Sequence, residues 1–315
     1  MKCHKRDPAW KNYSIAVMGL PRGMGAAMFG RLRRLSSCLR STAARALGSD
    51  RNRSDRDYGG RLAGMTADYI LETKGLTKEF KGFTAVNQVD LKVRRGSIHA
   101  LIGPNGAGKT TCFNLLTKFL PVTRGEIFYN GRDITSLKPA DIARLGLIRS
   151  FQISAVFPHL TVLENVRIAL QRQRGSSFDF WRSETTLDQF NERAMELIEW
   201  VGLSDYAGAI AVEMPYGRKR ALEIATTLAL EPEMMLLDEP TAGMGHEDID
   251  RIVELVRRVS AGRTVLMVEH NLSVVSTLCE TITVLTRGQV LAEGNYATVS
   301  NNPDVIQAYM GTAHG

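Results

Sequence analysis

The stretch 103-GPNGAGKT-110 decides the fold class of this chain. It matches the pattern G-x-x-x-x-G-K-[S/T] and follows a short apolar run that ends in glycine, 97-SIHALIG-103. Glycines permit backbone angles that direct successive N–H groups at phosphate oxygens, and a helix that starts here directs its positive end at the same anion. A strand, a glycine-rich loop and a helix in this order predict a phosphate-binding loop.

The side chains at the end of this loop have distinct expected roles. Lys109 is expected to reach the β- and γ-phosphates of a nucleotide, and the Thr110 hydroxyl is expected to bind Mg²⁺. The residues expected to surround the nucleotide phosphates are Gly103, Pro104, Asn105, Gly106, Ala107, Gly108, Lys109, Thr110 and Thr111.

A second acidic motif supports this interpretation. The run 234-MMLLDE-239 has four apolar residues followed by two acids, as in a buried strand that ends at the ligand-binding edge of an open α/β sheet. A strand that ends in two acids is common at protein surfaces, so this motif alone is a weak sign of a nucleotide site. Together with the phosphate loop it becomes a strong one. We expect Asp238 to hold Mg²⁺ and Glu239 to orient or deprotonate the attacking water.

The order of the remaining segments predicts an α/β core. Strand patterns occur at 69–76, 86–93, 125–131, 264–269, 281–288 and 289–294, and helical spacing occurs at 109–119, 161–173, 187–203 and around 301–311. The buried-strand runs at 234–239 and 264–269 are each followed by a helix, which indicates a parallel sheet. A small antiparallel strand region is expected before this core, with a helical insert near 153–230.

The basic charge of the chain belongs to its first 66 residues. The whole chain has a net charge of +7, but residues 1–66 contain 14 Lys/Arg against 4 Asp/Glu, which leaves 26 against 29 for residues 67–315. The body is therefore close to neutral, and its charge does not predict binding to nucleic acid. No uninterrupted apolar run of about 18 residues is present, so no membrane-spanning helix is expected. The four cysteines have neither metal-ligand nor redox spacing, which suits a reducing compartment.

Residues 1–66 are expected to form a basic, disordered N-terminal extension, separate from a nucleotide-binding domain at 67–315. The segment is rich in arginine and serine and is broken by Pro8, Pro21 and several glycines. A transit-like presequence also fits this composition. A further alternative is that Met65 is the physiological start, because the strand pattern begins directly after it.

With these motifs in this order, the chain resembles the ATP-binding subunit of an ABC transporter over about residues 68–312. The resemblance implies a P-loop NTPase cassette with a RecA-like core, an antiparallel β subdomain and a helical subdomain, and it implies ATP and Mg²⁺ as cofactors. Phe80 lies where the family stacks an aromatic ring on adenine, although a core position is the alternative for a phenylalanine. Gln152, in 149-RSFQ-152, matches the glutamine that contacts Mg²⁺ and water in the family and couples to the membrane subunits. His270 matches the histidine that contacts the γ-phosphate, so the implied catalytic set is Lys109, Gln152, Glu239 and His270.

The segment 213-EMPYGRKRALEIA-225 occupies the position of the family's signature motif. In the family, two cassettes pair head to tail, and this motif contacts the ATP held by the partner; the residues implied here are Pro215, Tyr216 and Gly217. Pro215 stands where a serine is usual and lacks both a hydroxyl and an N–H, which predicts a loss of about 1.5–3 kcal/mol at that half-site. A proline is compatible with the first turn of a helix. Gly245 stands where an aspartate is frequent, so we expect a heterodimer with two unequal ATP sites.

The subgroup is also indicated by resemblance. The signature PYG with RxLEIA, the run 236-LLDEPTAGM-244 and the ending NNPDVIQAYMG are similar to the first of two cassettes in branched-chain amino acid importers. Cassettes of urea/amide importers and of lipid or polysaccharide exporters are the alternatives, and a soluble ABC ATPase is less favoured because only one phosphate loop and no heptad run occur. The implied partners are a second ATPase subunit, two transmembrane permease subunits and, indirectly, an extracytoplasmic solute-binding protein, at the cytoplasmic face of the inner membrane. No nucleic-acid partner is expected.

Overall fold

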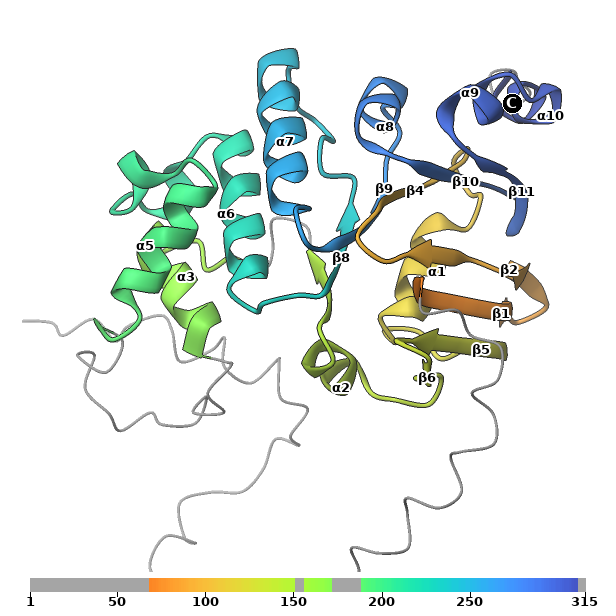
Figure 1. The fold of residues 1–315 in the computed structure, drawn as a ribbon, viewed down its shortest axis with the longest axis horizontal. Helices are drawn as coiled ribbons and strands as arrows, with labels where there is room; N and C mark the ends of the chain where they lie inside the picture. The colour runs from red at the N-terminus through yellow and green to blue at the C-terminus, as the bar shows by residue number, and fades with distance from the viewer. Residues whose placement is uncertain (1–67, 151–155, 172–187, 311–315) are drawn as a thin grey trace, which may run out of the picture. The chain divides into compact units, whose positions relative to one another are not determined.

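The computed structural model describes residues 68–150, 156–171 and 188–310, and Figure 1 shows their arrangement. A six-stranded sheet has the order β11-β10-β4-β9-β8-β7. These strands span, in that order, Gln289–Gly294, Thr281–Thr286, Ile98–Ile102, Thr264–Val268, Met234–Asp238 and Leu147–Ser150. All neighbouring pairs are parallel except β10 and β11, which are antiparallel.

The three central strands of this sheet are buried along their whole length. Every residue of β4, β8 and β9 is buried, as their apolar sequences predict for strands covered on both faces. Alternate residues enter two different cores: Leu236 packs into one cluster and Leu237 into the other. The strands are parallel, so their following residues meet at one edge of the sheet, where Asp238 of β8 pairs with Val268 of β9.

A second sheet is antiparallel. It has the order β2-β1-β5-β6, with β3 paired to β1; these strands span Phe83–Val89, Tyr69–Phe80, Arg124–Tyr129, Arg132–Asp133 and Lys92–Arg94, in that order. Three of its strands precede β4 as predicted, but its other two strands, β5 and β6, follow α1 (Lys109–Leu116) in the chain. The strand expected at 86–93 is divided into β2 and β3. Between them, the Asp90 carboxylate accepts the Gly75 N–H at 2.6 Å, and β1 shifts register after Leu76. The turn between β2 and β3 thus provides an acceptor for the Gly75 N–H close to the irregularity in β1.

The first helix, α1 (Lys109–Leu116), begins at the predicted residue but ends before the predicted Phe119. The Thr117 hydroxyl donates to the Phe113 carbonyl at 2.7 Å, and Lys118 has a φ of 62°. A left-handed residue cannot continue a right-handed helix, so the chain leaves the helix there.

The predicted helical insert contains α3 (Val162–Gln171), α5 (Asn191–Trp200) and α6 (Tyr216–Leu228), which contact one another (Figure 1). Helix α6 also contacts β7 and α7 (His246–Val259). The exact limits of the insert, 153–230, remain a prediction, because residues 151–155 and 172–187 lie outside the described part.

The short elements that were not predicted include β6, α2 (Pro139–Arg144), β7 and α9 (Tyr296–Ser300). The chain ends with α8 (Leu272–Leu278), α9 and α10 (Pro303–Met310); α10 coincides with the helix expected around 301–311. Within the described residues, no helix combines the length and apolar character that a membrane span requires.

Candidate functional site

The phosphate loop connects β4 to α1, as the sequence predicts. Gly108 is the N-cap of α1 and has a φ of 101°. A Cβ atom at this position would lie 2.5 Å from the Ala85 carbonyl oxygen of β2. Glycine is therefore required at position 108 both by the backbone angle and by the close approach of a neighbouring strand.

Lys109 folds back over the loop that it follows. Its Nζ donates to the carbonyl oxygens of Gly103 at 2.7 Å and Pro104 at 3.0 Å. Burial lowers the pKa of this ammonium group, while the negative charges of Glu239 and Asp238 act in the opposite direction. Lys109 therefore lies within electrostatic reach of both carboxylates, at the edge of the sheet where the sequence places them.

Asp238 is the last residue of β8, and two arginines hold it. Its carboxylate forms a buried ion pair with Arg149, which also donates to the Asn114 side chain at 2.6 Å. Its backbone carbonyl accepts a hydrogen bond from Arg220 of α6 at 2.5 Å. Sequence reasoning missed both arginines. Arg149 lies three residues before Gln152, but the four-residue strand β7 that places it beside Asp238 is too short for a periodic signal.

Glu239 and His270 lie side by side on the loops that follow β8 and β9. The His270 Nε2 atom is 2.8 Å from the Glu239 Oε1 atom, and both side chains are about two-fifths exposed. The Glu239 N–H donates to the Val268 carbonyl at 2.9 Å, and Glu239 has a φ of 46°. A left-handed non-glycine residue costs about 1–3 kcal/mol, and such residues cluster at functional sites.

The donor set fits Mg²⁺ shared with a nucleotide. Asp238 supplies a carboxylate and Thr110 a hydroxyl in the first turn of α1, and both are the hard oxygen ligands that Mg²⁺ prefers. In the described ranges, no group of three or more His, Cys, Asp or Glu side chains could hold a metal ion by itself. Gln152, the third expected ligand, lies outside the described residues.

Phe80 lies at the end of β1, where it pairs with Phe83 across the turn into β2. Its side chain is 41% exposed, so the alternative of a core phenylalanine is wrong. The Lys78 ammonium lies 5.0 Å from the centre of its ring. Stacking on adenine remains a prediction.

The signature segment begins α6, with one correction to the expected position of its proline. Pro215 is the N-cap of α6 and precedes the first turn; its carbonyl accepts the N–H groups of Arg218 and Lys219, both at 3.0 Å. No hydrogen bond among the described residues uses the N–H of Tyr216 or Gly217. These groups are the donors that the sequence analysis expects to remain for an anion.

Gly217 also has a role within its own chain. A Cβ atom here would lie 2.9 Å from the Asp248 Cγ atom in the first turn of α7. Glycine at 217 therefore leaves room for the end of the Asp248 side chain. Gly245, where the family often has aspartate, is the N-cap of α7.

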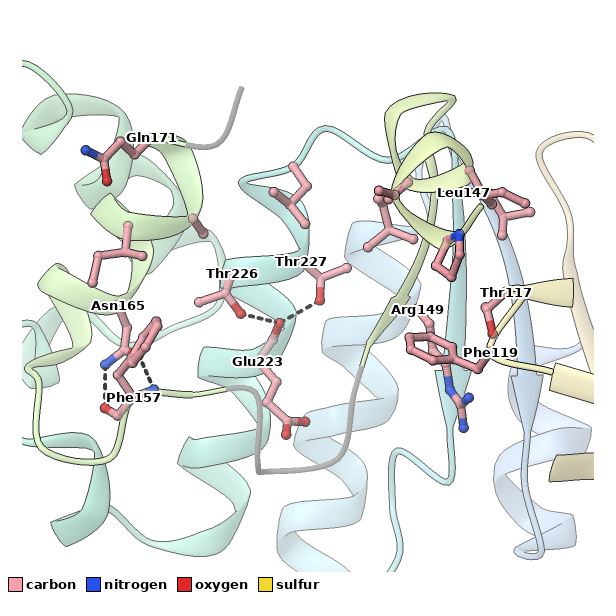
Figure 2. Close-up of a pocket in the computed structure, with 18 residues that line it drawn as sticks. Thr117, Phe119, Leu147, Arg149, Phe157, Asn165, Gln171, Glu223, Thr226 and Thr227 are labelled. Atoms are coloured by element: carbon pink, nitrogen blue, oxygen red, sulfur yellow. Dashed lines mark hydrogen bonds between the residues drawn. The ribbon is translucent and has the colours of Figure 1, made fainter. Parts of the chain in front are cut away.

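A cleft of about 560 Å³ lies between the parallel sheet and the helical group (Figure 2). It is lined by the end of α1, by α2 and β7, and by α3 and α6, and its walls are mainly apolar. Phe119 and Phe157 face it, and each is 51% exposed. Glu223 of α6 also lines the cleft; burial raises the pKa of its carboxyl to about 7, against the opposing effect of Arg220.

Comparisons with known proteins agree with this geometry. Residues 86–242 match the family model described as ABC transporter, and residues 289–315 match the model described as branched-chain amino acid ATP-binding cassette transporter. The chain is 39% identical over 251 residues to the high-affinity branched-chain amino acid transport ATP-binding protein BraF of Pseudomonas aeruginosa, and this match covers 78% of the chain and 98% of BraF. It is 37% identical over 256 residues to LivG of Escherichia coli, which has the same descriptive name, with the same coverage.

Solved structures that resemble the chain are also ATP-binding cassettes of ABC transporters. The ADP conformation of MJ1267, an ATP-binding cassette of an ABC transporter, matches with a TM-score of 0.68 and 30% identity, over 77% of this chain and 99% of that chain. A nucleotide-free cassette from an ABC transporter matches with a TM-score of 0.68 and 29% identity, over 76% and 98%.

Proposed function

The chain belongs to the ATP-binding subunits of ABC transporters, and from this premise we propose that it hydrolyses ATP to energise the import of branched-chain amino acids. The observation that carries the proposed site is that the phosphate loop leads into α1 at Lys109, while Asp238 at the end of β8 and the adjacent Glu239 act on the charge of that lysine. The edge thus combines an ammonium group, a helix N-terminus and two carboxylates, which are the groups that phosphoryl transfer to water uses.

Each polar group at this edge has a proposed role. Lys109 exchanges its two carbonyl partners for phosphate oxygens, and Glu239 orients or deprotonates the attacking water. His270, which shares a hydrogen bond with Glu239, contacts the γ-phosphate. Asp238 and Thr110 would hold Mg²⁺, which would neutralise part of the phosphate charge. Gln152 completes this set in the proposal, and Phe80 stacks on adenine.

Substitution of Glu239 tests the catalytic assignment. In Glu239→Gln, the side chain keeps its size but loses its basicity, so we expect ATP binding within about twofold of the parent and hydrolysis lowered by about 10²–10⁴-fold. Unchanged hydrolysis in the assembled transporter would remove Glu239 from the mechanism.

The membrane subunits are proposed to dock at the cleft between the parallel sheet and the helical group. The exposed rings of Phe119 and Phe157 offer an apolar surface, and β7, which leads towards Gln152, forms part of the wall. A permease segment with an apolar face would bury these rings. The proposed assembly contains two transmembrane permease subunits, a second ATPase subunit and, indirectly, a solute-binding protein, with this chain peripheral to the cytoplasmic face of the inner membrane.

The cargo is proposed from the relatives named above and from the match at residues 289–315. Urea or amide import and lipid or polysaccharide export would use the same ATP-site residues. The test is ATPase activity of the complex formed with the permeases encoded beside this chain. Stimulation by a binding protein loaded with leucine supports the proposal, and stimulation only by one loaded with urea replaces it.

The signature segment supports a proposed pairing with a different cassette. Pro215 offers neither hydroxyl nor N–H, so this chain contributes a weaker half-site to the ATP of its partner. We expect Pro215→Ser to strengthen ATP-driven pairing in the complex, measured as the fraction of dimer at a fixed ATP concentration. An unchanged dimer fraction and ATPase rate would contradict the proposed asymmetry.

A further inference from the structure

Glu269 follows β9 and has a carboxylate buried between two loops. Its side chain is 2% exposed. The Oε1 atom accepts hydrogen bonds from the Thr241 backbone N–H at 2.9 Å and from the Thr241 hydroxyl at 2.7 Å. The Oε2 atom accepts the backbone N–H groups of His270 at 3.0 Å and Asn271 at 3.3 Å.

These four hydrogen bonds join the two loops that carry the hydrolytic residues. Thr241 lies two residues after Glu239 on the loop that follows β8, and His270 is the residue after Glu269 on the loop that follows β9. The Asn271 side chain in turn accepts the N–H of Ser273 at the start of α8. Glu269 therefore fixes one loop against the other and against the helix that follows.

The site is built for a carboxylate. Among the described residues, no ion pair includes Glu269, so four N–H and O–H donors balance its charge. A glutamine has the same size but only one oxygen acceptor. With the NH₂ group towards His270 and Asn271, both of their backbone N–H groups lose their acceptor; with it towards Thr241, the Thr241 N–H loses its acceptor and the hydroxyl has to turn and accept from the amide.

We propose that Glu269 is a positioning residue that holds Glu239 and His270 in the geometry for hydrolysis. It acts through Thr241 on one side and through the His270 backbone on the other. The inference rests on the roles proposed above for Glu239 and His270. The 2.8 Å contact between those two side chains depends on both loops keeping their relative position.

The first test compares steady-state ATPase kinetics of the transporter complex containing the parent chain or Glu269→Gln. We expect kcat to fall about 10- to 100-fold, as when the support of an active-site residue is removed, with the KM for ATP within about twofold. The phosphate loop and Lys109 do not use Glu269, so binding of a fluorescent ATP analogue should be retained. An unchanged kcat, or equal losses of kcat and ATP binding, would overturn the proposal.

Thr241 supplies a second, milder test in case Glu269→Gln does not fold. Thr241→Val removes the hydroxyl with little change in shape, and Thr241→Ser retains it. We expect Thr241→Val to lower kcat severalfold at constant KM and Thr241→Ser to restore the parent value; equal kcat for the two variants would contradict the inference.

The Glu239→Gln and His270→Ala variants separate this inference from the proposed function. If both retain hydrolysis, the proposed catalytic pair is wrong, whatever Glu269 does. If both lose hydrolysis and Glu269→Gln retains it, only the positioning role is wrong.

Discussion

Arg149 and Asp238 form a buried ion pair at the edge of the parallel sheet, with side chains only 11% and 8% exposed. The carboxylate proposed to hold Mg²⁺ is therefore already compensated by a cation of the same chain. Mg²⁺ that enters with ATP must compete with the Arg149 guanidinium for Asp238, and Arg149 lies three residues before Gln152.

Removal of this arginine should destabilise the protein in the absence of Mg²⁺. Breaking a buried pair from one side leaves an uncompensated charge, so we expect Arg149→Met to lower the free energy of unfolding by about 3–5 kcal/mol. Urea unfolding in EDTA measures this loss. Mg²⁺–ATP supplies a replacement cation and should stabilise the variant more than the parent.

Arg144→Met is the matched control for Arg149. Arg144 pairs with Asp141 on the surface of α2, with side chains 75% and 43% exposed, and its removal should change stability little. If the two substitutions had equal effects on unfolding, the buried ion pair would not be an important source of stability.

A methyl group at position 217 should be tolerated, because only the end of the Asp248 side chain stands in its way. That side chain is 40% exposed and can rotate aside, and alanine is more favourable than glycine within a helix. We therefore expect Gly217→Ala to change the free energy of unfolding by less than about 1 kcal/mol, measured by thermal unfolding with Gly217→Ala combined with Asp248→Ala as the control. A large loss that the second substitution relieves would mean that the Asp248 side chain is held in place.

Phe80 should contribute to nucleotide affinity, and Phe83 should not. Both rings lie at the turn between β1 and β2, and Phe83 is the more exposed at 66%. We expect Phe80→Ala to weaken ATP binding by about 1–3 kcal/mol, a typical value for loss of stacking on a base, and Phe80→Trp to preserve it. Calorimetric titration with Phe83→Ala as the control tests this assignment, and equal affinities for Phe80→Ala and the parent would exclude it.

His99 should make the fold sensitive to acid. Burial lowers the pKa of this β4 side chain from 6.5 to about 4. Its Nε2 atom lies 2.8 Å from the Thr283 hydroxyl, which donates to Glu293 at 2.6 Å and therefore accepts from the imidazole N–H. The unfolded chain binds the proton first as the pH falls, so the contribution to stability is complete above about pH 6.5 and is lost towards pH 4.

The size of this effect follows from the shift, which corresponds to about 3 kcal/mol over that range. Urea unfolding of the parent and of His99→Gln at pH 7, 5.5 and 4.5 measures it. The variant should lose less stability on acidification than the parent, and parallel losses would mean that His99 binds its proton equally well in the folded and unfolded chain.

The sequence predicted the parts of the fold that depend on long patterns. The runs at 234–239 and 264–269 are continuous apolar segments, so β8, β9 and the edge where they end could be predicted, and Lys109 was expected at the start of a helix. The four residues of β7 are too short for a periodic signal. Arg149 was missed for this reason, because its pairing with Asp238 depends on β7 lying beside β8.

Other differences between the predictions and the structure arise from contacts between distant segments, which leave no pattern in the nearby sequence. Nothing near Phe80 in the sequence distinguishes an exposed ring from a core ring, since both occur at strand ends. In the sequence, Glu269 looks like a solvent-exposed acid beside a histidine. In the structure, the loop that carries Thr241 lies against it, so its carboxylate is a buried hydrogen-bond acceptor. The roles of Gln152 and of residues 1–66 stay predictions, because these residues lie outside the described part.

Helix α6 extends from the signature residues, past Asp238, to the cleft proposed for permease docking. It begins at the signature residues, its Arg220 holds the Asp238 carbonyl one turn later, and its last turns present Glu223, Thr226 and Thr227 to the cleft. Thirteen helical residues extend over about 20 Å without a hinge. A displacement of α6 by a permease docked in the cleft would therefore move the whole helix as a rigid body. The Asp238 peptide, which Arg220 holds, and the signature residues at the start of α6 would shift together.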